Sequence, residues 1–296
     1  MNPQQWFENN FINRIEGKDG PADRCRRYLL DYKKKEFPHC PKCGSDQFWE
    51  IKSRVLLHCE ECNHQISPTA NTVFHKVRKI THWFKAFWQM AGAETPSISN
   101  LKKVAGFGSR HTAIKCFEII QALMGVANFN PLAENIYVGH TEITIDNETK
   151  SILIAAQSED KEKLPKNIRI KVFDNVEDKY KESLQEWVDE KVNIYLPWNL
   201  SCFSNEDISC DNIYSYKDIE IPTVKKTYQL FEEWIKKNYR NKNSFERLDL
   251  SINEFIWRFN RYKLETNKTN FSSQWKQRDG FNELIKLAVT HKLTYE

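Results

Sequence analysis

The sequence lacks any apolar run that approaches the roughly 18 residues a helix needs to cross a membrane, and its mean hydropathy is −0.68. Its first ten residues, Met1 to Asn10, are polar and lack the charged start and apolar core of a secretory signal. It shows no internal repeat and no low-complexity tract. We therefore expect a cytoplasmic protein with no membrane partner. Its 296 residues allow two or three domains.

The eight cysteines do not follow a disulfide pattern. Four form two Cys-x-x-Cys pairs, while Cys25, Cys116, Cys202 and Cys210 are scattered along the chain. In a reducing compartment such pairs indicate metal ligands, and scattered cysteines indicate ordinary thiols. The pattern predicts one metal site and four free thiols.

The paired cysteines have the spacing of a zinc ribbon. Fifteen residues separate the two pairs, and these residues alternate over 47–57 as a β-hairpin does. Gly44 and Asn63 follow the pairs and suit the tight turn of a zinc knuckle. Four thiolates complete a tetrahedral Zn²⁺ site with no open position, so the zinc is structural. The predicted ligands are Cys40, Cys43, Cys59 and Cys62.

Two other interpretations of this segment are a redox Cys-x-x-Cys motif and chance spacing. The flanking His39, His58 and His64 could each replace a cysteine as a ligand. Four cysteines make that replacement unnecessary, and solvated histidines are the simpler account.

Charge divides the chain unevenly. Residues 1–130 contain 19 Lys/Arg against 12 Asp/Glu, a net charge of +7, and residues 131–296 contain 25 against 28, a net charge of −3. A polyanionic partner is therefore expected on the N-terminal half.

Hydrophobic periodicity predicts an α/β protein. N-terminal helices (residues 1–37) precede the zinc ribbon (38–80) and a helical segment (81–130). The last segment, 131–296, carries strands near 136–145, 151–156, 168–173 and 192–196, a helix over 179–189, an irregular acidic stretch over 199–221, and C-terminal helices over 223–239, 248–262 and 280–291.

The stretch from Ser97 to Phe117 has the pattern of a helix-turn-helix. A short helix, a turn at residues 106–108 and a longer helix follow one another. The start of the second helix would face the major groove of double-stranded DNA, and basic residues of the first helix would reach phosphates. The predicted DNA-binding residues are Lys102, Lys103, Ser109, Arg110, His111, Thr112 and Lys115. The alternative is a pair of packed helices in an ordinary bundle.

The order of these motifs resembles a known family. The run from Cys40 to Lys76, followed by Trp83-Phe84, is similar to the N-terminal part of zinc-ribbon insertion-sequence transposases, the bacterial relatives of the Merlin DNA transposons. The helix Asn253 to Arg261 resembles the C-terminal signature of that family, and residues 222–235 resemble the helix before it. The resemblance implies that residues 131–296 form an RNase H-like domain.

The same resemblance implies a metal-dependent reaction, which we expect this chain to have lost. Such transposases hold two Mg²⁺ ions with acidic residues on the sheet and cleave DNA. Here Thr144 and Leu196 occupy the two aspartate positions of the strands, and a leucine cannot bind a hard cation. The carboxylates that could replace them are Glu142, Asp146 and Glu232, each of which is also explained as solvated surface charge.

Three functions follow. The first is a DNA-binding protein derived from an insertion-sequence transposase and lacking DDE catalysis. The second is an active DDE transposase, which would require Mg²⁺ for DNA transposition. The third is a zinc-ribbon module that binds proteins. The resemblance also implies self-association as a homo-oligomer.

Overall fold

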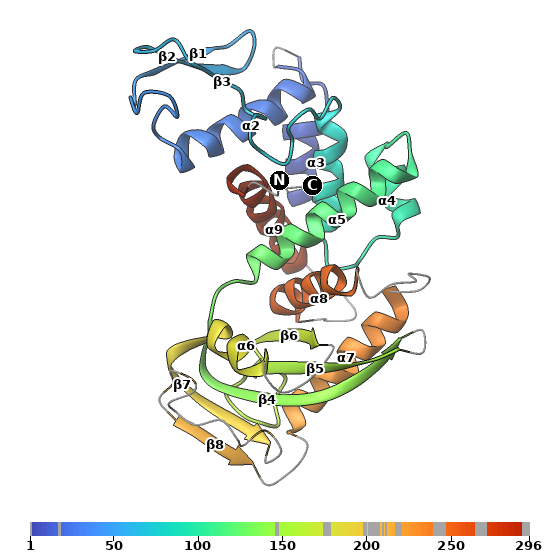
Figure 1. Cartoon of the computed structure of the whole chain (residues 1–296). Helices are drawn as coiled ribbons and strands as arrows, with labels where there is room; N and C mark the ends of the chain where they lie inside the picture. Colours follow the sequence, from blue (N-terminus) through green and yellow to red (C-terminus); the bar gives the residue numbers. More distant parts are fainter. Residues whose placement is uncertain are drawn as a thin grey trace. The chain divides into compact units, whose positions relative to one another are not determined.

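The computed structural model describes residues 2–16, 19–145, 148–173, 179–197, 200, 208, 210, 212–216, 221–238, 247–263 and 271–291 (Figure 1). The chain divides into two compact units. Unit 1 comprises Met1–Leu123 and Asn267–Glu296, and unit 2 comprises Met124–Thr266. Within the described ranges, no helix is both long enough and apolar enough to span a bilayer.

Unit 1 combines helices with a small three-stranded sheet. Its N-terminal helices are α1 (Pro3–Phe7), the π-helical turn η1 (Glu8–Ile12) and α2 (Pro21–Glu36). The antiparallel sheet contains β1 (Phe48–Ile51), β2 (Leu56–Cys59) and β3 (Gln65–Ile66). Then follow α3 (Ile80–Met90), α4 (Ile98–Ala105), α5 (Arg110–Ala127), whose last turn belongs to unit 2, and the C-terminal α9 (Phe271–Thr290).

An aromatic cluster around Phe281 of α9 forms the core of the helices of unit 1. The Phe281 ring centroid lies 5.4 Å from that of Phe7, 5.6 Å from Phe11, 5.8 Å from Phe84 and 5.7 Å from Trp88. These four partners come from α1, η1 and α3. Burying such rings together is among the larger contributions that side chains make to stability.

This packing changes the domain division expected from the sequence. The last helix was predicted within the segment 131–296, but α9 contacts α1, α2 and α3. A hydrogen bond from Tyr28 to Asn282 (2.6 Å) and an ion pair between Lys286 and Glu36 (2.9 Å) reinforce its place in unit 1. The amphipathic pattern predicts a helix here, but it does not specify which surface receives the apolar face.

Unit 2 is built on one mixed sheet. Its strands are β4 (Leu132–Ile145), β5 (Glu148–Gln157), β6 (Asn167–Phe173), β7 (Val188–Pro197) and β8 (Asn212–Tyr216), in the spatial order β6-β5-β4-β7-β8. The first three form antiparallel pairs, whereas β7 runs parallel to β4 and β8 runs parallel to β7. β8 lies within the stretch that was predicted to be irregular, so that prediction is wrong.

Helices cover both faces of this sheet (Figure 1). On one face, α6 (Lys179–Trp187) packs on a core that includes Ile136, Val138 and Leu196. On the other face, α7 (Pro222–Asn238) and α8 (Leu248–Tyr262) pack on Ile143 and Ile154. The two apolar sets lie at alternate positions of the strands, as the period of two requires.

Gly139 of β4 allows α7 to approach the sheet closely. A Cβ atom added at Gly139 would lie 2.5 Å from Cγ1 of Val224, which is too close for any real contact. We predict that Gly139→Ala lowers the free energy of unfolding by about 1–3 kcal/mol through overpacking. Chemical denaturation would measure it. In a Val224→Ala background the same change should cost clearly less, and an equal cost in both backgrounds would contradict this explanation.

Candidate zinc site and nucleic-acid interface

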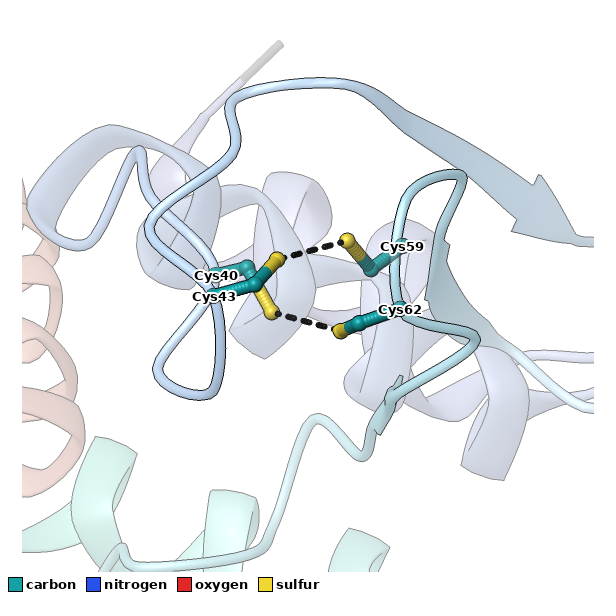
Figure 2. A group of neighbouring side chains, drawn as sticks. All are labelled: Cys40, Cys43, Cys59 and Cys62. Carbon is teal, nitrogen blue, oxygen red and sulfur yellow. Dashed lines mark hydrogen bonds between the residues drawn. The ribbon is translucent and has the colours of Figure 1, made fainter.

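The four predicted zinc ligands lie together in unit 1 (Figure 2). All four sulfur atoms lie within 4.8 Å of one another. The Sγ atoms of Cys40 and Cys62 are 3.6 Å apart, and those of Cys43 and Cys59 are 3.5 Å apart. Each close pair joins one knuckle to the other, so the four sulfurs form a compact cluster rather than two separate dithiols.

This cluster fits a zinc ion. A Zn–S distance of 2.3 Å in a tetrahedron requires sulfur atoms about 3.8 Å apart, close to the two separations above. Four thiolates are also the ligand set of a structural site that leaves no position for water or substrate. Zinc would therefore hold the two knuckles together without taking part in a reaction.

The backbone of the two knuckles follows one pattern. In the first knuckle the Gly44 N–H donates to the Cys40 carbonyl at 2.9 Å, and in the second the Asn63 N–H donates to the Cys59 carbonyl at 3.1 Å. Gly44 and Asn63 both adopt a left-handed conformation, with φ of 78° and 59°. Glycine and asparagine tolerate this conformation best. The prediction that these two residues make the knuckle turns is confirmed.

The flanking histidines are not part of this cluster. In the part of the chain that the structure describes, the cysteines are the one group of three or more His, Cys, Asp or Glu side chains close enough to hold a metal. His39 is exposed, and the ring of His58 packs against Trp49 with their centroids 4.9 Å apart. Histidine substitution for a cysteine is therefore unnecessary here.

The scattered cysteines differ from the zinc ligands. Cys25 and Cys116 are free thiols and fully buried, and this burial raises the pKa of both. Protonated, inaccessible thiols are poor nucleophiles and poor ligands. Cys210 is half-buried, and Cys202 lies outside the described residues.

The ribbon is attached to α2. Leu30 of α2 packs with Val55 and Leu57 of the ribbon, which together form a small buried cluster. Glu50 of β1 accepts hydrogen bonds from Arg27 and Lys34 of the same helix. The domain boundary expected at residue 37 separates this helix from the ribbon, but these contacts join the two into one structural element.

The predicted DNA-binding segment consists of α4, a turn and α5. Ser97 caps α4 by accepting a hydrogen bond from the N–H of Asn100 at 3.1 Å, and Ser109 accepts one from the N–H of Thr112 at 3.0 Å at the start of α5. Gly106 ends α4 with a φ of 79°. A Cβ atom at this position would also lie 3.2 Å from the ring of His82, so both backbone and packing favour glycine.

Two of the predicted base-reading residues extend from the first turn of α5 into solvent. Arg110 and His111 are exposed, and Lys115 is exposed one turn later. The hydroxyl groups of Ser109 and Thr112 lie 2.8 Å apart and bind each other. These two side chains therefore stabilise the helix end, and the charged surface comes from their neighbours.

The basic residues of α4 are the predicted phosphate contacts. Lys103 is exposed and Lys102 is half-buried, and both lie in the last turn of the helix. Cations at this end of a helix interact favourably with its dipole. Both could still extend an ammonium group toward a phosphate.

The two strand positions aligned with catalytic aspartates do not lie together. Leu196 of β7 is fully buried in the core beneath α6, where it lies beside Val138, because Tyr137 pairs with Tyr195 one residue earlier. Thr144 lies six residues beyond Val138 along β4, roughly 20 Å away at about 3.4 Å per residue. Whether Thr144 and Leu196 lie at one site therefore depends on the register between β4 and β7, which the sequence alone does not provide.

The remaining carboxylates also lie apart. Glu142 is exposed on β4, on the opposite face of the sheet from the core residue Ile143. Glu232 lies on α7, which covers the face of Ile143, and its carboxylate pairs with Lys236 at 2.7 Å. Asp146 lies outside the described residues. Glu142 and Glu232 therefore do not converge on one ion.

Part of unit 1 matches a known family. Residues 22–65 match the family model of the transposase zinc-ribbon domain of the IS1595 family. A comparison with curated proteins finds no match to the chain. The matched segment includes most of α2 together with both knuckles, in agreement with the contacts that join this helix to the ribbon.

We predict that Cys59→Ser abolishes stoichiometric zinc binding and unfolds the ribbon, because the metal supplies much of the folding free energy of such small elements. Zinc content of the purified protein and limited proteolysis within residues 38–66 would measure both effects. His39→Ala is the matched control and should retain one zinc per chain. Full zinc content in Cys59→Ser would contradict the tetrathiolate site.

Proposed function

We propose that this chain is a DNA-binding protein related to insertion-sequence transposases and that it does not perform metal-dependent DNA cleavage. The observation that carries the proposal is the four-cysteine cluster within a segment that matches the transposase zinc-ribbon domain. Domains of this type usually bind DNA.

Charge and geometry support a DNA contact in unit 1. Residues 1–130 carry the positive net charge of the chain. Arg110 and His111 extend from the N-terminal turn of α5, where a recognition helix presents its base-reading side chains. Lys102 and Lys103 lie at the end of the preceding helix, and we assign them to phosphate contacts that position the protein without reading sequence.

Strand order supports an RNase H-like identity for unit 2. Three antiparallel strands are followed by two strands parallel to the first, with α6 between the third and fourth strands. This is the arrangement of the RNase H-like fold, in which catalytic carboxylates lie near the ends of the central parallel strands. We assign unit 2 to that fold on this basis.

The chemistry of the sheet supports the loss of cleavage. Leu196 is a core residue beside Val138, and neither side chain offers oxygen to a cation. Mg²⁺ binds almost exclusively oxygen ligands in near-octahedral geometry. Glu142 and Glu232 lie on opposite faces of the sheet, so they cannot together replace a pair of aspartates.

We predict different effects for two substitutions in the helix pair. Arg110→Ala should reduce discrimination between DNA sequences by about 1–3 kcal/mol at the affected base pair. Lys102→Ala should weaken binding to all sequences and reduce the slope of log affinity against log salt concentration by about 1. Selection from a random DNA pool, followed by titrations at several salt concentrations, would measure both.

Lys171→Ala is the matched control, because Lys171 is an exposed lysine of unit 2. It should change neither the sequence preference nor the salt slope. Identical effects of the Arg110 and Lys102 substitutions would contradict the assignment of α5 as the recognition helix. No affinity for DNA at low salt would instead favour a module that binds proteins.

We predict that the zinc-loaded protein leaves supercoiled DNA intact in Mg²⁺ or Mn²⁺. The substrate should be a plasmid that carries the DNA flanking the coding sequence, and the readouts are nicked and strand-transfer products. Cleavage that is abolished by Asp146→Ala or Glu142→Ala would overturn the proposed loss of catalysis. Retained DNA binding in the same preparation is the control for folding.

A further inference from the structure

The tripeptide Asn-Ile-Tyr occurs three times in unit 2, at residues 135–137, 193–195 and 212–214. The expectation that the chain has no internal repeat is therefore wrong at the scale of a tripeptide. β4, β7 and β8 bring the three copies into register. Asn135 pairs with Asn193 and Tyr137 with Tyr195, while β7 pairs the same two positions with Asn212 and Tyr214.

The side chains of the repeat form two ladders across the three strands. The Asn212 amide donates to the Asn193 side-chain oxygen at 3.1 Å, and the Asn193 amide donates to that of Asn135 at 3.2 Å. The tyrosine rings stack face to face. Centroids are 4.7 Å apart between Tyr137 and Tyr195 and 4.9 Å apart between Tyr195 and Tyr214, with interplanar angles of 17° and 18°.

Both ladders end on β8, the last strand of the sheet. Tyr214 is 45% exposed, and within the described residues its ring stacks on Tyr195 alone. Asn212 is exposed and, within the same residues, bonds through its side chain to Asn193 alone. Among the described residues, therefore, none covers the outer face of the Tyr214 ring or bonds to the side-chain oxygen of Asn212.

The two edges of this sheet are protected to different degrees. On the other edge, β6 carries Arg169 and Lys171, and the side chain of Asn260 accepts from the N–H of Ile168 at 2.8 Å and donates to its carbonyl at 3.4 Å. Charges and capping of this kind prevent edge-to-edge pairing. β8 reads Asn-Ile-Tyr-Ser-Tyr, without charge or proline.

We propose that β8 pairs with β8 of a second copy of this chain, antiparallel about a two-fold axis normal to the sheet, with Tyr214 stacked on Tyr214 of the second copy. The β8 strands of the two copies are identical and contain no charged residue, so no like charges meet within the paired strands. A two-fold axis makes the contact close on itself, as isologous interfaces do. The three-ring stack becomes a six-ring stack, and the outer backbone groups of β8 gain partners.

This interface is independent of the proposed DNA-binding function. Its core is one strand of five residues on each side, well below the roughly 1,000 Å² expected of a stable complex. The dimer therefore forms at high protein concentration and dissociates on dilution. DNA that brings two copies together would increase its population.

Sedimentation of the full zinc-loaded chain without DNA tests the proposal. The wild type should shift from monomer to dimer as its concentration rises. Tyr214→Lys, which places on this strand the charge that natural edges use, should weaken the association at least tenfold. Tyr214→Phe keeps the ring and should associate as the wild type does. Phe129→Lys is the matched control, since Phe129 is an exposed aromatic residue of the same unit (69%) and should leave association unchanged.

Amide hydrogen exchange locates the contact. Exchange in residues 212–216 should slow as the protein concentration rises, while exchange in β6 should not change. If Tyr214→Lys fails to fold, Ser215→Lys places a charge on the opposite face of the same strand and should also weaken association. A wild type that remains monomeric at high concentration would overturn the proposal, and a partner other than a second copy would then have to pair with β8. A dimer that neither lysine substitution weakens would also overturn it.

Discussion

The tetrahedral coordination that zinc requires is the constraint on which the zinc ribbon depends. The ribbon has three short strands and buries only a few apolar side chains, so its own core cannot hold the two knuckles together. Four thiolates around one zinc ion would supply the missing free energy. The ribbon then gains a second support from α2, whose Arg27 and Lys34 bind Glu50 of the ribbon sheet.

Features that depend on local spacing were predictable from the sequence. The knuckle turns at Gly44 and Asn63 and the cap of α5 at Ser109 depend on interactions within a few residues, and the zinc ligands occur as two Cys-x-x-Cys pairs. Each needs a specific side chain at a specific offset, and the sequence displays the offset directly. The same holds for most helices and strands, whose apolar periodicity reflects one buried face.

Features that depend on distant partners were not predictable. α9 belongs to unit 1 because Phe281 fits among rings from α1, η1 and α3, and no local pattern encodes that choice. β8 is short and lies in an irregular stretch, so its strand character arises from pairing with β7. The separation of Thr144 from Leu196 likewise required the register between β4 and β7.

β7 carries packed side chains on both of its faces. One face of this strand contributes Val192, Ile194 and Leu196 to the core beneath α6. The other contributes Asn193 and Tyr195 to the ladders that fix the register of three parallel strands. A carboxylate at Leu196 would have to be desolvated within that core, which is costly without a cation. Both faces of β7 are therefore occupied by packed side chains, and the edge of the sheet next to it is formed by β8.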